Sequence, residues 1–135
     1  MFRRIDDRMT VSPQITPADV ADAAAHGFTL IVNNRPDGEQ PGQPAGAEIA
    51  AAAAAAGLNY VAIPITPGGF GEDQITAMRD ALEAASGPVL GYCRSGARST
   101  FLWALARARL GDAPATLVAK AAAAGYDIAP IAGRL

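Results

Sequence analysis

The one cysteine of the chain opens a segment with the composition of an anion-binding loop. Cys93 begins the sequence CRSGAR, residues 93–98, between an apolar β-forming run and a stretch with helical character. A loop that opens a helix turns several backbone N–H groups toward one centre, and the helix N-terminus adds roughly half a positive charge there. Gly96 permits the backbone conformation that such a loop needs, and the planar fork of Arg98 can hold an oxyanion with two hydrogen bonds.

These groups predict that Cys93 is held as a thiolate and acts as a catalytic nucleophile. Helix N-termini and neighbouring cations bring such thiols to pKa values of about 3.5–7.5. A buried structural cysteine is the alternative, since free cysteines are commonly apolar core residues. Two arginines, a glycine and a serine directly after a strand signal favour the nucleophile, with Arg98 as its catalytic partner. The expected substrate-binding residues of this segment are Arg94, Ser95, Gly96, Ala97 and Ser99, of which Ser99 could cap the helix or bond the thiolate.

Arg35 is the candidate outside this segment. It follows an apolar run, and the carboxyl ends of parallel strands face the ligand crevice of an α/β sheet, so Arg35 could bind the anion of a substrate. A salt bridge from Arg35 to Asp37 or Glu39 is the alternative, and the sequence does not separate the two. His26, the only histidine, lies at an expected helix end, where we expect it to interact with the helix dipole.

Helix and strand signals alternate along the chain, which predicts an α/β architecture. Thr16 can cap a helix that begins at Pro17. The expected helices cover residues 17–26, 45–56, 73–85, 99–110 and 115–124, and the expected strands end at Ser12 or cover residues 28–32, 59–63 and 88–92. Residues 33–44 and 65–71 are rich in proline and glycine and are expected to be loops, the second of them mobile.

The composition predicts one soluble domain over residues 1–135. Half of the 135 residues are hydrophobic and 18% are charged, which excludes a disordered chain. The net charge of −2 gives no sign of the basic face that a nucleic-acid-binding protein has. One cysteine and one histidine are too few to bind zinc or to form an internal disulfide. With no signal peptide and no apolar span of roughly 18 residues, we expect a cytoplasmic protein without membrane contact, metal or cofactor.

Two motifs of the chain resemble known families. Residues 93–99 are similar to the active loop of rhodanese-type sulfurtransferases and, more distantly, to the signature loop of protein tyrosine phosphatases. Residues 11–15 (VSPQI) and 33–39 (NNRPDGE), with Pro64, resemble a bacterial family known as DUF442, or as the phosphatase-like domain of beta-lactamase hydrolase-like proteins, whose members are also described as sulfur transferases. The resemblance covers nearly the whole chain. It implies a three-layer, tyrosine-phosphatase-like α/β fold with a central, mostly parallel sheet of four to five strands flanked by helices.

Loop length separates the two activities that this resemblance implies. Tyrosine phosphatases place five residues between cysteine and arginine, whereas four lie between Cys93 and Arg98, as in rhodanese-like sulfurtransferases. Tyr92 stands where tyrosine phosphatases usually have histidine. No aspartate is clearly placed as a general acid, although Glu72 or Asp73 could serve. Sulfite or a low-pKa thiolate leaves without protonation, so a sulfurtransferase has less need of an acid.

We therefore expect sulfur transfer through a persulfide on Cys93. The small anionic donor is thiosulfate or a persulfide, and an external thiol or cyanide must accept the sulfur because the chain has no second cysteine. A cysteine-dependent phosphatase is the first alternative, in which Cys93 takes the phosphoryl group of a phosphate ester and water releases it. A non-catalytic sensor of anions or persulfides is the second.

Overall fold

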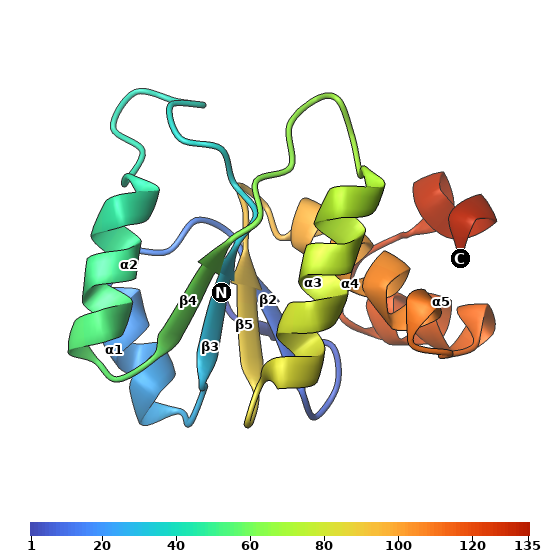
Figure 1. Ribbon diagram of the computed structural model, residues 1–135, viewed down its shortest axis with the longest axis horizontal. Coiled ribbons are helices and arrows are strands. Elements are labelled where there is room, and N and C mark those ends of the chain that lie inside the picture. Colours follow the sequence, from blue (N-terminus) through green and yellow to red (C-terminus); the bar gives the residue numbers. More distant parts are fainter.

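The computed structural model describes residues 1–135 as one sheet with helices on both faces (Figure 1). The strands are β1 (Arg3–Arg4), β2 (Met9–Ser12), β3 (Leu30–Asn33), β4 (Asn59–Ala62) and β5 (Val89–Tyr92). The helices are α1 (Pro17–Ala25), α2 (Gly46–Ala55), α3 (Glu72–Ala84), α4 (Ala97–Arg109) and α5 (Pro114–Ala123), followed by the 3-10 helix η1 (Ala129–Arg134). The prediction of a mostly parallel sheet flanked by helices is confirmed, with five strands.

The sheet brings the ends of distant strands to one edge. Its order is β1-β2-β5-β3-β4, and only β1 runs antiparallel to its neighbour. β5 lies in the middle, so Tyr92 faces Ser12 of β2 and Asn33 of β3. Since parallel strands end at the same edge, the segments after β2, β3, β4 and β5 meet there. The backbone continues this contact beyond the strands, because the N–H of Asn34 donates to the carbonyl of Tyr92 at 2.8 Å.

Local signals determine the helix ends. Thr16 caps α1, as predicted. The structure adds a complete capping box, because the Thr16 side chain accepts from the N–H of Asp19 while the Asp19 carboxylate accepts from the N–H of Thr16. The strand expected from residue 28 begins only at Leu30. The reason is that the N–H of Phe28 donates back to the carbonyl of Ala23 and so still belongs to the end of α1.

Two apolar clusters pack on the sheet. One surrounds Trp103 of α4, and it also contains residues of β2, β5, α3, α5 and η1. The other surrounds Ile31 and Leu90 and is covered by α1 and α2. Five consecutive residues of α4, 102–106, are buried, so the helix that follows the Cys93 loop is enclosed by other parts of the fold. None of the helices combines the length and apolar character needed to cross a bilayer.

Truncation of Leu90 tests the central position of β5. Leu90 is fully buried, so Leu90→Ala is expected to lower the free energy of unfolding by about 2–5 kcal/mol, measured by denaturant titration. Val118→Ala is the control, because Val118 is 40% exposed on α5 and its truncation should change stability by at most about 0.5 kcal/mol. Similar losses in the two variants would contradict this packing.

Candidate active site

Cys93 lies at the carboxyl edge of the sheet, directly after β5. It is fully buried, and its Sγ accepts a hydrogen bond from the N–H of Gly96 at 3.1 Å. Gly96 has a φ of 92°, in the left-handed region that favours glycine, and it precedes the first residue of α4. The chain therefore folds back over the sulfur between β5 and α4, in the strand, loop and helix arrangement that the sequence predicted.

The loop after Cys93 has several free backbone donors. The N–H groups of four residues donate to no protein acceptor, namely Arg94, Ser95, Arg98 and Ser99. The N–H of Ala97 donates to the Oγ of Ser95 at 3.3 Å. Unpaired donors at the start of a helix, together with the helix dipole, attract an anion. The loop is thus suited to hold an oxyanion beside the sulfur of Cys93.

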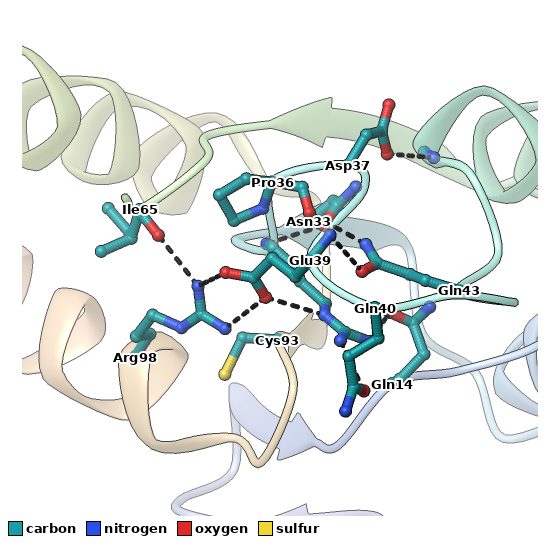
Figure 2. A network of polar contacts seen from close by, with 12 residues as sticks. Gln14, Asn33, Pro36, Asp37, Glu39, Gln40, Gln43, Ile65, Cys93 and Arg98 are labelled. Carbon is teal, nitrogen blue, oxygen red and sulfur yellow. Dashed lines mark hydrogen bonds and ion pairs between the residues drawn. The ribbon is translucent and has the colours of Figure 1, made fainter. Parts of the chain in front are cut away.

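Arg98 is held by a carboxylate from another loop. Its Nη1 donates to Oε2 of Glu39 at 2.8 Å and its Nη2 donates to Oε1 at 2.8 Å, which is a bidentate ion pair (Figure 2). Nη1 also donates to the carbonyl of Ile65 at 2.9 Å. Glu39 belongs to the loop after β3 and Ile65 to the loop after β4. The guanidinium therefore joins three of the segments that meet at this edge.

Arg35 forms a second ion pair with Glu39. It is only 4% exposed, and its Nε donates to Oε1 of Glu39 at 2.9 Å. Its Nη1 and Nη2 donate to the side-chain carbonyls of Gln14 and Gln40, each at 3.0 Å. The salt-bridge alternative for Arg35 is thus seen in the structure, with Glu39 as the partner, whereas Asp37 accepts from the N–H of Gly46 at the start of α2. Substrate binding by Arg35 stays a prediction.

The two arginines keep Glu39 ionised. The hydrogen bond from Arg98 is the main cause that lowers the pKa of the Glu39 carboxyl from its ordinary 4.5 to about 2. Partial burial opposes this change, and the hydrogen bond from Arg35 adds to it. The same pair raises the pKa of Arg98, mainly through the hydrogen bond with Glu39. Glu39 therefore carries a negative charge at neutral pH and has no proton to donate.

The remaining predicted residues differ in their surroundings. Arg94 and Ser95 are exposed, and the side chain of Arg94 makes no ion pair or hydrogen bond within the protein. Ser99 is buried, and its Oγ has no hydrogen-bond partner, so neither of its two expected hydrogen bonds is present. His26 caps the end of α1, as expected, and its Nδ1 lies 2.7 Å from the carbonyl of Asp22.

Neither of the two carboxyl groups that could serve as a general acid, Glu72 and Asp73, forms a hydrogen bond or ion pair with the Cys93 loop. Glu72 pairs with Arg109 at 2.6 Å, and Arg109 is the last residue of α4, about 18 Å along the helix from its start. Asp73 is exposed in the first turn of α3 and forms no ion pair. The loop between β4 and α3 contains no acidic residue. The carboxyl group that contacts Arg98 beside the Cys93 loop is therefore that of Glu39, which is ionised.

Sequence reasoning missed two residues that contact the site. Glu39 lies within the motif at residues 33–39, where its spacing indicates a partner for Arg35 but gives no sign of its ion pair with Arg98. Tyr126, near the C-terminus, donates from its hydroxyl to the carbonyl of Ser95 at 3.0 Å. No motif surrounds Tyr126, so the sequence contains no local signal for this contact.

The amino-acid sequence of this chain is similar to that of a known family and of several of its members. Residues 1–110 match the family described as beta-lactamase hydrolase-like protein, phosphatase-like domain. The beta-lactamase hydrolase-like protein of Agrobacterium fabrum is 40% identical over 105 residues, which cover 78% of this chain and 24% of the relative. The protein of the same description from Xylella fastidiosa strain Temecula1 is 38% identical over 101 residues. This chain spans about a quarter of the length of the curated relatives it matches.

Solved structures share its fold. A candidate phosphatase from Neisseria meningitidis is 32% identical, with a TM-score of 0.83 over 98% of this chain and 94% of that one. TpbA of P. aeruginosa, solved in complex with pTyr, is 17% identical, with a TM-score of 0.63 over 88% of this chain and 70% of that one. The second likeness is one of fold alone. Together these structures confirm the predicted phosphatase-like α/β fold.

The ion pairs of Glu39 should make stability depend on pH. Because folding lowers the pKa of Glu39, its contribution to stability is complete above pH 4.5 and is lost as the pH falls toward about 2. Glu39→Gln should therefore unfold more easily than the wild type at neutral pH. The difference in the free energy of unfolding should shrink between pH 4.5 and about 2, which denaturant titrations across this range would measure.

Glu48→Gln is the control for the loss of a carboxylate, because Glu48 is exposed and forms no ion pair. A difference between Glu39→Gln and the wild type that stays constant down to pH 2 would contradict the role of the ion pairs.

Proposed function

The chain belongs to the family of phosphatase-like domains of beta-lactamase hydrolase-like proteins, and we propose that it transfers sulfane sulfur from a small anionic donor through Cys93. The observation that carries the proposal is that the site lacks a proton donor. Its carboxyl group, Glu39, is ionised by two arginines, and Glu72 is bound to Arg109 far along α4. Such a site suits a leaving group that departs as a stable anion.

Thiosulfate has such a leaving group. The Cys93 thiolate attacks the outer sulfur of thiosulfate, a new S–S bond forms to Cys93, and the S–S bond of the donor breaks. Its electron pair leaves with sulfite, so no proton is needed and the Cys93 persulfide keeps one negative charge. Cyanide or an external thiolate then attacks the outer sulfur, and the Cys93 thiolate is restored. A second cysteine is not available within the chain for this step.

Arg98 can bind the donor while it stays paired with Glu39. The carboxylate uses one N–H of each Nη, and the carbonyl of Ile65 takes the second N–H of Nη1. The Nε–H and one Nη2–H remain free and lie on the same edge of the planar group. Two parallel donors on one edge match two oxygens of a sulfonate or phosphate group. Glu39 thereby acts as a positioning residue that fixes which edge of Arg98 faces the substrate.

A phosphatase is the second candidate. The family description and the Neisseria structure both support it. In this reaction Cys93 attacks phosphorus, the P–O bond breaks, and water later releases phosphate from the cysteine. Without a general acid, the leaving oxygen must be stable as an anion, so aryl phosphates would react far better than alkyl phosphates.

Paired assays separate the two candidates. For the wild type we expect thiosulfate to add the mass of one sulfur atom to Cys93, and cyanide to yield thiocyanate in turnover. Cys93→Ser should lower this activity by at least about 10³-fold, because the nucleophile is lost. Hydrolysis of an aryl phosphate without persulfide formation would contradict the proposal and support the phosphatase. If neither reaction occurs, yet Cys93→Ser abolishes thermal stabilisation by anions, the chain is a sensor.

Two further variants test the absence of an acid. Glu72→Gln and Asp73→Asn should each leave the rate of sulfur transfer within about twofold of the wild type, because neither carboxyl contacts the loop. Their kcat values with thiosulfate and with an aryl phosphate would be compared. A loss of about 10²-fold or more in either variant would identify a general acid and contradict the mechanism.

A further inference from the structure

The segment after α5 contacts the outer side of the Cys93 loop. α5 ends at Ala123, Gly125 follows with a φ of 95°, and the N–H of Tyr126 donates back to the carbonyl of Ala121 at 2.9 Å. This helix ending fixes the direction in which the chain leaves α5. Ile128, which is 1% exposed, anchors the next turn in the core. Tyr126 is thereby directed at the loop, and its hydroxyl donates to the carbonyl of Ser95 at 3.0 Å.

The carbonyl of Ser95 belongs to the same peptide unit as the N–H of Gly96. In a planar trans peptide these two groups point in opposite directions. The carbonyl side accepts from Tyr126, and the N–H side donates to Sγ of Cys93 at 3.1 Å. We infer that Tyr126 is a positioning residue: its hydroxyl holds this one peptide so that the N–H of Gly96 points at the nucleophilic sulfur.

Two properties of the contact support this role. Hydrogen bonds in a chain polarise one another, so a donor on the carbonyl strengthens the donation by the N–H at the other end. The peptide also precedes a glycine, which can adopt many backbone conformations, so that an unheld peptide could turn its N–H away from the sulfur. Burial raises the pKa of Tyr126, which keeps its hydroxyl protonated and able to donate at neutral pH.

Other residues hold Tyr126 in place. The guanidinium of Arg3 lies 5.5 Å from the centre of the Tyr126 ring, and its Nη1 donates to the carbonyl of Ala124 at 3.3 Å. The end of the ring packs closely on Gly96, because a Cβ built there would lie 2.3 Å from the hydroxyl oxygen. Residues 111–135 lie outside the stretch that matches the family, so this contact comes from a part of the chain beyond that match.

The inference rests on the proposed role of Cys93 as nucleophile, and Tyr126→Phe tests it. The variant keeps the ring against Gly96 and Arg3 and removes only the hydroxyl. Losing one hydrogen bond to the loop should lower kcat/KM for sulfur transfer roughly three- to tenfold. At neutral pH, the ultraviolet absorbance of the Cys93 thiolate, taken as the difference from Cys93→Ser, should be lower than in the wild type, because the N–H of Gly96 is held less firmly toward the sulfur. A merely structural role of the hydroxyl would not move this absorbance.

Tyr92→Phe is the matched control, because the Tyr92 hydroxyl makes no hydrogen bond in the structure. It should leave the thiolate absorbance unchanged. Arg3→Gln should shift the absorbance in the same direction as Tyr126→Phe but by less, because the ring is loosened while the hydroxyl remains. Equal thiolate absorbance and equal kcat/KM in Tyr126→Phe and the wild type would overturn the inference. If the wild type transfers no sulfur, the proposed function fails, while the absorbance still tests Tyr126.

Discussion

The candidate site depends on the ion pairs that the carboxylate of Glu39 forms with Arg98 and Arg35. One side chain accepts three hydrogen bonds of 2.8–2.9 Å from two guanidinium groups. Through Arg98 it joins the loop after β3 to the first turn of α4, and through Arg35 it reaches Gln14 after β2. Without this negative charge, the two arginines would lie close together with uncompensated charge, and Arg35 is almost fully buried. The orientation of the Arg98 guanidinium follows from this ion pair.

The fold brings these groups together by the order of its strands. β5 lies between β2 and β3, so the loops that follow these three strands are adjacent in space although they are distant in the chain. α4 is enclosed on most sides, which fixes the helix end that faces the anion. The result is a buried sulfur that accepts from the N–H of Gly96, in a loop that carries free N–H groups and leads into Arg98. This arrangement supports the proposal that Cys93 attacks a small anion with a stable leaving group.

Much of this arrangement could be predicted, because its signals are local. The capping of α1 by Thr16 depends on neighbouring residues, and so does the loop that begins at Cys93, since its motif is contiguous. The partner of Arg98 could not be predicted, because Glu39 lies 59 residues away and strand order decides the pairing. The contact between Tyr126 and Ser95 spans 31 residues and depends on how α5 and η1 pack. Local patterns carry no information about such packing.

The close contact between Gly96 and Tyr126 restricts which residues this chain can hold at these two positions. While position 126 is tyrosine, any larger residue at 96 would place its Cβ 2.3 Å from the hydroxyl oxygen. A smaller residue at 126 would remove that collision, but it would also remove the donor to Ser95. The two positions therefore form an epistatic pair: the effect of a substitution at one depends on the residue at the other. A substitution in the C-terminal segment at position 126 would thus bear on the conformation of the Cys93 loop.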